Sequence, residues 1–174
     1  AMDSDMEPAV ILGIWRQIMM ASLTRQNKDL IFAVHKGALP AAIWHMGSAL
    51  SARHCDDFGS VLALLKSASC RYGLVPATKD DTALAKAICA TPKIYIMART
   101  TLFPIPTVEP AYILADYLPD ESGDDISLIA VPQADDSFKI VTLDGYFADH
   151  LPEACGPSAQ LLGICLLYTS DAAD

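Results

Sequence analysis

The segment FGSVLALLKSASCRYGLVP, residues 58–76, combines a helical pattern with a strand pattern. Apolar side chains recur with the i, i+3, i+4, i+7 spacing of an amphipathic helix over residues 57–67, at Phe58, Val61, Leu62 and Leu65. Residues 71–76 then form a short, mostly apolar run that Pro76 ends, which predicts a buried strand. A helix that leads into a buried strand favours an α/β domain.

The flanking sequence extends this alternation in both directions. Upstream, residues 30–35 predict a buried strand and residues 38–53 a helix. Downstream, residues 81–89 predict a short helix, and four strand-like runs follow, at residues 93–99, 111–115, 126–131 and 138–143. Strands that alternate with helices first and follow one another later predict an α/β fold with a mixed sheet.

Composition narrows the classes of function. The formal charge is −9, or −7 without Asp171 and Asp174, which argues against a nucleic-acid or anionic-membrane footprint. No apolar run is long enough to span a bilayer and no signal peptide is recognisable, so we expect a cytoplasmic protein. The cysteines and histidines lack zinc-binding spacing, and we expect no metal and no cofactor. Acidic doublets such as Asp56-Asp57 are interpreted as helix caps and turns.

An amphipathic helix is predicted near the N-terminus. Its apolar stripe, at Ile11, Ile14, Trp15, Ile18 and Met19, is expected to be buried. The stripe continues into Ser22 and Gln26, which lie four residues apart on one helical face and could contact a single small ligand. The alternative is a helix end at which the stripe surfaces. Trp15 and Trp44, at helical spacing within apolar patterns, are expected in the core.

The run IWRQI, followed by ASLTRQ at residues 21–26, resembles the last helix of the all-helical chorismate mutases. The resemblance implies that Ser22 and Gln26 are catalytic: Ser22 would bind a substrate carboxylate, and Gln26 would donate to the ether oxygen of the breaking bond. The reaction of that family, the rearrangement of chorismate to prephenate, is unimolecular. It needs a reactive conformer held in place and stabilisation of the charge that grows on the ether oxygen, but no nucleophile and no metal. The family's carboxylate-binding cations come from earlier helices, so we expect this chain to be part of a longer protein.

The α/β region resembles prephenate dehydratase domains, which are related to periplasmic-binding proteins, over residues 30–131. The similarity is carried by residues 58–65 with 72–76, and by the segment GDDISL at residues 123–128. Three motifs of that family are replaced here: a Gly-Thr-Phe-Ser turn by residues 37–40, a Glu-Asn-Ser run by residues 77–79, and a Thr-Arg-Phe triplet by residues 110–112. Ala and Pro side chains supply neither cation nor acid, so dehydratase activity is not expected.

Residues 165–174, CLLYTSDAAD, resemble the translation of a sequencing adapter, and we exclude them from fold prediction. The expected domains are residues 1–28, the last helix of a mutase domain; residues 29–164, a dehydratase-like α/β domain; and residues 165–174, a non-native tail. The α/β part also resembles the degenerate dehydratase-like domains attached to some bacterial chorismate mutases.

Three functions remain open from the sequence. The first is a chorismate mutase whose attached dehydratase-like domain is inactive; this chain alone would then lack activity, because one helix cannot bind both carboxylates of chorismate. The second is an atypical prephenate dehydratase, and the third is a non-catalytic module that binds an aromatic amino acid. The expected partners are chorismate in the full-length protein, an aromatic amino acid effector, and a second copy joined through the missing helical domain.

Overall fold

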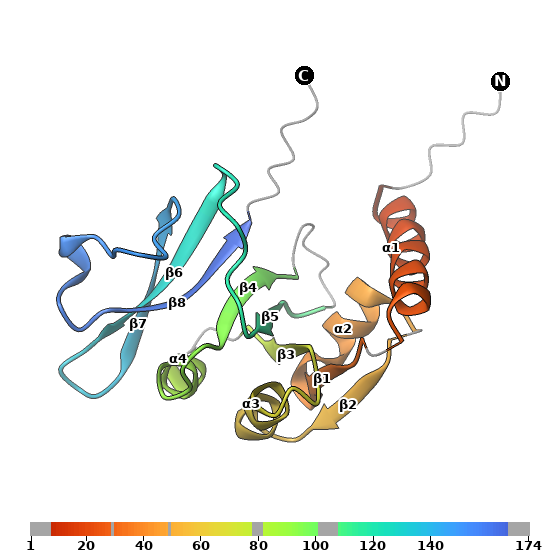
Figure 1. Cartoon of the computed structure of the whole chain (residues 1–174), viewed down its shortest axis with the longest axis horizontal. Helices are drawn as coiled ribbons and strands as arrows, with labels where there is room; N and C mark the ends of the chain where they lie inside the picture. The colour runs from red at the N-terminus through yellow and green to blue at the C-terminus, as the bar shows by residue number, and fades with distance from the viewer. Residues whose placement is uncertain (1–7, 29, 49, 78–81, 101–107, 167–174) are drawn as a thin grey trace.

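The computed structural model of the 174-residue chain describes residues 8–28, 30–48, 50–77, 82–100 and 108–166. Helices lie on both faces of a mixed sheet in this part of the chain (Figure 1). None of the described helices combines the length and apolar character that crossing a bilayer demands. The helices are α1 (Pro8–Gln26), α2 (Leu39–Met46), α3 (Phe58–Lys66) and α4 (Thr82–Cys89), with 3-10 turns η1 (Lys36–Ala38) and η2 (Glu153–Cys155).

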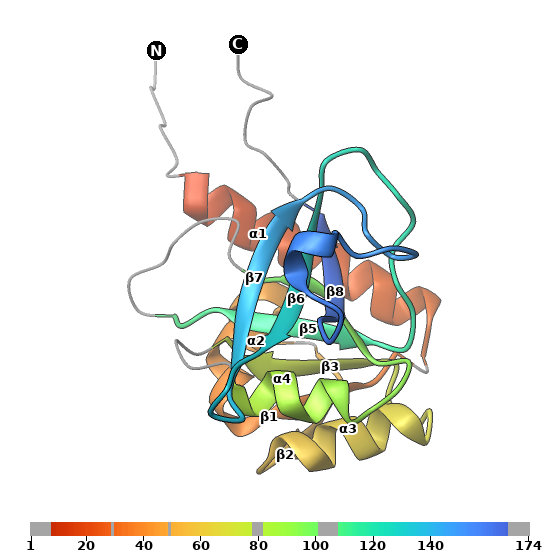
Figure 2. The same ribbon diagram turned by 90° about the vertical axis from the view of Figure 1, so that its left-hand side faces the viewer.

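The strands are β1 (Phe32–His35), β2 (Ala52–Cys55), β3 (Tyr72–Pro76), β4 (Tyr95–Arg99), β5 (Ala111–Ala115), β6 (Asp125–Pro132), β7 (Phe138–Asp144) and β8 (Gln160–Leu166). They lie in the order β2-β1-β3-β5-β4-β8-β6-β7. Strand β1 is parallel to β2 and β3, β5 is antiparallel to β3 and β4, and β8 joins the two halves by pairing parallel with β4 and antiparallel with β6. In Figure 2 strands β6, β7 and β8 run in a different direction from β3 and β5, as expected for a twisted sheet. The predicted α/β fold with a mixed sheet is confirmed.

Alternate residues of the central strands belong to two separate hydrophobic cores, one on each face of the sheet. Ala33 of β1 and Val75 of β3 belong to the core under α3 and α4, whereas Val34 and Leu74 belong to the core under α2. All four side chains are fully buried. The strand period of two therefore explains why residues 30–35 and 71–76 are continuously apolar: helices cover both faces of the sheet.

The close approach of α3 to the sheet depends on Gly73. A Cβ at this position would lie 2.8 Å from Val61 Cγ1 and 3.0 Å from Leu65 Cδ1, so only glycine allows the present packing. Helix α3 begins after Asp57, whose carboxylate accepts a hydrogen bond from the Ser60 backbone N–H at 2.8 Å. The helix and strand predicted within residues 57–76 are confirmed, and so is the interpretation of Asp57 as a cap.

Two predicted elements differ from the structure. The helix expected over residues 38–53 ends at Met46, because Gly47 adopts a positive φ of 83°, and residues 52–55 form the edge strand β2. An edge strand buries few side chains and so leaves a weak pattern. Strand β8 was missed, and it includes Cys165 and Leu166, beyond the predicted boundary at Ile164. Strand pairing uses backbone peptide groups, so β8 can extend into residues 165 and 166 whatever the origin of that segment. The origin of residues 165–174 in a sequencing adapter stays a prediction.

The expectation that the apolar stripe of α1 is buried is wrong for this chain. Ile11, Trp15 and Ile18 are 51%, 59% and 55% exposed, so Trp15 is not a core residue; Trp44 is half-buried. Helix α1 instead packs on α2 through its other side, where Gly13 faces Trp44 and Gln17 lies against Gly47. The absence of a side chain on Gly47 leaves room for Gln17, which a Cβ there would overlap. Periodicity identifies an apolar stripe without identifying its partner.

Candidate functional site

Ser22 and Gln26 lie one turn apart at the C-terminal end of α1, and both side chains are exposed. Gln26 Nε2 donates a hydrogen bond to Ser22 Oγ at 3.3 Å. The expectation that they face the interior of this chain is wrong, because the stripe that they continue is itself on the surface. Their catalytic role stays a prediction.

Gln26 also lines a groove between the end of α1 and the sheet. The groove has a volume of about 370 Å³ and runs over the face of β3, β5 and β4 next to α2. We call it the methionine groove, because Met20 of α1, Met46 of α2 and Met97 of β4 all line it, together with residues such as Leu23 and Tyr72. The C-terminal end of the predicted mutase helix therefore lies beside the α/β domain at this groove.

A second candidate site lies at the carboxyl ends of β1 and β3. The chain leaves β1 for β2 on one side and returns to β3 on the other side, so the order of the strands reverses at this point. Ligands of open α/β sheets bind outside the carboxyl ends of the strands at such a switch point. The residues that follow β1 and β3 are therefore the natural candidates for ligand contacts, and those that follow β2, the other parallel neighbour of β1, lie beside them.

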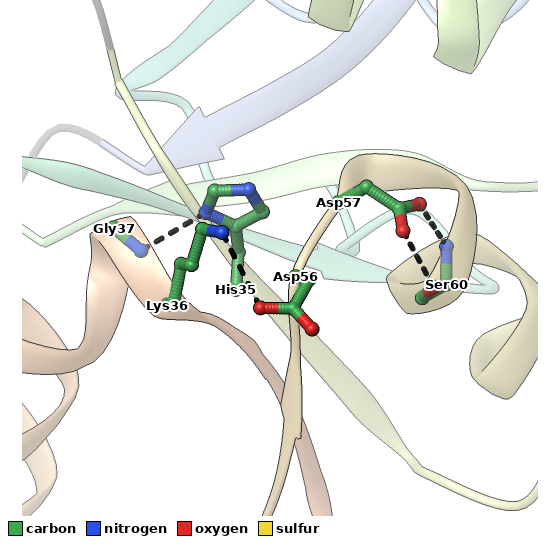
Figure 3. A network of polar contacts seen from close by, with 6 residues as sticks. All are labelled: His35, Lys36, Gly37, Asp56, Asp57 and Ser60. Carbon is green, nitrogen blue, oxygen red and sulfur yellow. Dashed lines mark hydrogen bonds and ion pairs between the residues drawn. The ribbon is translucent and has the colours of Figure 1, made fainter.

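Figure 3 shows the polar groups at this edge. His35 Nδ1 accepts a hydrogen bond from the Gly37 backbone N–H at 3.0 Å, so a neutral His35 carries its proton on Nε2. The imidazole stacks on the Phe58 ring, with 5.0 Å between the centroids. Lys36 Nζ lies 3.3 Å from Asp56 Oδ1, and both side chains are largely exposed. An exposed ion pair of this kind is weak, so Lys36 is available to an incoming anion.

The carboxylate of Asp57 serves the backbone rather than a substrate. It accepts hydrogen bonds from both the N–H and the hydroxyl of Ser60, at 2.8 and 2.9 Å, and these bonds hold the pKa of Asp57 below its usual value. Burial raises the pKa of the nearby Cys55 thiol, which therefore stays protonated. This arrangement provides a cation and a hydrogen-bond donor, but no activated nucleophile among these groups.

The three places at which dehydratase motifs are replaced come together at this edge. Gly37 follows β1, and a Cβ on it would lie 3.4 Å from Pro76 Cγ at the end of β3. The backbone N–H of Ala77 donates to the Pro110 carbonyl at 2.8 Å. Thr78 and Lys79 lie outside the described residues. The segments singled out by the resemblance are thus neighbours in space.

Sequence reasoning missed His35, Lys36 and Asp56, which it interpreted only as strand, turn and cap residues. The signal that could have found them is their position at the end of β1 or directly after β1 and β2, which are parallel neighbours. The part of the chain that the structure describes contains no cluster of three or more His, Cys, Asp or Glu side chains able to hold a metal ion.

Comparison with known proteins supports the fold. No protein-family model and no curated protein matches the chain. Among solved structures, GqqA, described as a novel type of quorum quenching acylase, is 9% identical with a TM-score of 0.55, over 79% of this chain and 95% of that one. A prephenate dehydratase from Streptococcus mutans is 13% identical with a TM-score of 0.50, over 78% of this chain and 97% of that one. The chain therefore has a prephenate dehydratase-like fold. These similarities give no support to a chorismate mutase domain.

Proposed function

We propose that the α/β domain binds a small aromatic carboxylate at the carboxyl edge of β1 and β3 without converting it. The single observation that carries the proposal is the position of Lys36 and His35 at the switch point of a dehydratase-like fold. Lys36 would pair with the ligand carboxylate, and His35 would donate from Nε2. The Phe58 ring offers an apolar surface beside them. An aromatic amino acid has the matching combination of ring and carboxylate.

We do not expect the domain to catalyse the dehydration of prephenate. Decarboxylative dehydration of prephenate needs cationic contacts to its carboxylates and an acid for the departing hydroxyl. Gly37, Ala77 and Pro110 bring no polar side chain to the edge. An atypical dehydratase that uses His35 as the acid is the alternative, and product formation separates the two.

We expect Lys36→Met to weaken the binding of L-phenylalanine about tenfold or more, the value of a charge-assisted hydrogen bond. Isothermal titration calorimetry on the whole chain measures this effect. Lys66→Met, at the exposed C-terminal end of α3, is the matched control and should bind as the unmodified chain does. Equal affinity in the Lys36 variant would remove this edge from the proposal. Formation of phenylpyruvate from added prephenate would replace binding alone with dehydratase activity.

A second candidate function concerns α1. We propose that α1 belongs to a chorismate mutase domain of a longer, homodimeric protein that an aromatic amino acid regulates. The supporting observation is the row of seven exposed apolar side chains on α1, which is typical of a helix with a missing helical partner: Val10, Ile11, Ile14, Trp15, Ile18, Met19 and Leu23. The five cysteines of the chain are free thiols, which favours the reducing cytoplasm as the location of the protein.

In a protein that contains the complete helical domain, we expect Gln26→Ala to lower the kcat of chorismate conversion about 100-fold, as for loss of one donor to a developing oxyanion. Gln17→Ala is the matched control on the same helix and should leave kcat unchanged, because Gln17 packs beside Gly47, which directly follows α2. The present chain alone should show no turnover. Normal kcat in the Gln26 variant would exclude this residue from the site.

A further inference from the structure

The methionine groove has the properties of a small-molecule site. Its volume of about 370 Å³ falls within the usual range of ligand pockets, roughly 300 to 1,000 Å³. Its floor is well buried, since Leu30, Phe32 and Met46 are 9%, 3% and 5% exposed. Its rim includes Leu23, which is 45% exposed, and Gln26. A buried apolar floor with a polar group at the mouth is the usual arrangement of such pockets.

The lining side chains define the chemistry of the ligand. None of the ten described residues that line the groove carries a charge, so a charged ligand group would lose its hydration there without gaining an ion pair from them. Three methionines from three elements converge on the space, and thioether sulfur makes favourable contacts with aromatic rings. These features favour an uncharged aromatic ring.

Aromatic and polar groups are already placed to receive such a ring. Phe32 of the floor and the neighbouring Tyr72 stack with 5.4 Å between their centroids, so two aromatic rings lie side by side in the lining. The Tyr72 hydroxyl is held by that of Tyr117 at 3.0 Å, which fixes the ring. The Gln26 amide makes a long 3.3 Å bond to Ser22 at the surface, so a ligand can replace that bond at little cost.

We propose that the methionine groove binds a small uncharged aromatic molecule of one ring or two fused rings, with the Gln26 amide hydrogen-bonding its polar atom. The groove lies on the α2 face of the sheet and not at the β1/β3 edge, so the inference does not rest on the amino acid site proposed above. It also differs from the mutase proposal, whose ligand is a dianion.

Indole is a suitable probe, and methyl-labelled methionine gives a local readout. In NMR spectra of the whole chain, indole should shift the methyl signals of Met20, Met46 and Met97 in a saturable way. The signal of Met19, which is 46% exposed and is not among the lining residues, should move less than theirs. Indole-3-acetate should bind at least about tenfold more weakly, because none of the described lining residues offers a cation to its carboxylate. Unmoved signals of the three groove methionines, or equal affinity for the acid, would overturn the proposal.

Variants test the position of the ligand. Leu23→Trp fills the mouth of the groove and should abolish the shifts, whereas Ile18→Trp, at a site that is 55% exposed on the outer face, should retain them. Both positions are on the surface, so both variants should fold. Gln26→Ala should weaken indole binding about two- to tenfold, as expected for one hydrogen bond. Full binding by the Leu23 variant would place indole elsewhere and contradict the proposal.

Discussion

Replacing Gly163 with alanine is expected to lower the free energy of unfolding by about 3 kcal/mol, the upper end of the usual cost of overpacking. Gly163 is buried in β8, opposite Ile96 of β4. A Cβ at Gly163 would overlap the Ile96 carbonyl, and backbone atoms cannot move aside as a flexible side chain can. The β4–β8 pair joins the two halves of the sheet, so the strain falls on the seam between them.

Thermal unfolding followed by circular dichroism measures this effect, which corresponds to a decrease of roughly 6 to 12 °C in Tm for a chain of this size. Gly13→Ala is the matched control. A Cβ at Gly13 would lie 3.9 Å from Trp44, an ordinary contact, and alanine is favoured over glycine in a helix by about 1 kcal/mol. This control should therefore be slightly stabilised. A Gly163 variant that melts with the unmodified protein would show that β4 and β8 are not paired as described.

The central elements of the fold were predictable because they bury residues on a regular period. Residues 57–67 and 71–76 carry the apolar pattern of a helix and a doubly covered strand, and the structure has α3 and β3 there. Strand β2 was missed because an edge strand with the exposed residues Arg53 and His54 has no apolar pattern. The end of α2 depends on the backbone conformation of a single residue, Gly47.

The candidate sites were less predictable, because each is assembled from segments far apart in the sequence. Spacing placed Ser22 and Gln26 on one helical face correctly, and their hydrogen bond shows it. Spacing could not show that the same helix docks on α2 through Gly13 and Gln17, which leaves the apolar stripe outside. The ion pair of Lys36 and Asp56 joins the ends of two strands, and one of these strands was itself not predicted.

The second large effect expected is a loss of stability between neutral pH and pH 4, caused by His45. Its imidazole is packed between α1 and α2, and burial, followed by the positive charge of Arg16, lowers the pKa of His45 from 6.5 to about 4. Neither His45 Nδ1 nor Arg16 Nη2 has a hydrogen-bond partner among the described residues. The folded protein therefore keeps His45 neutral where the unfolded chain binds a proton.

Because the unfolded state binds more protons between pH 6.5 and about 4, the free energy of unfolding falls as the pH is lowered through this range. The loss attributable to His45 reaches about 3 kcal/mol at the lower end. His45→Leu places an apolar side chain at the α1–α2 contact and removes the titrating group. It should therefore flatten the dependence of the free energy of unfolding on pH in this range. Urea titrations at several pH values between 7 and 4 measure this change in dependence.

His54→Gln is the control for this experiment, because His54 is exposed on the edge strand β2 and the substitution should leave the pH profile unchanged. The carboxylates of Asp57 and Asp125, whose hydrogen bonds lower their pKa values from the usual 3.8, lose their contribution only below about pH 5. The effect of His45 is thus separated from theirs between about pH 6.5 and pH 5. If the His45 variant loses stability between pH 6.5 and 4 as steeply as the unmodified chain, the contact between α1 and α2 does not exclude the proton, and the packing of these helices differs from that described here.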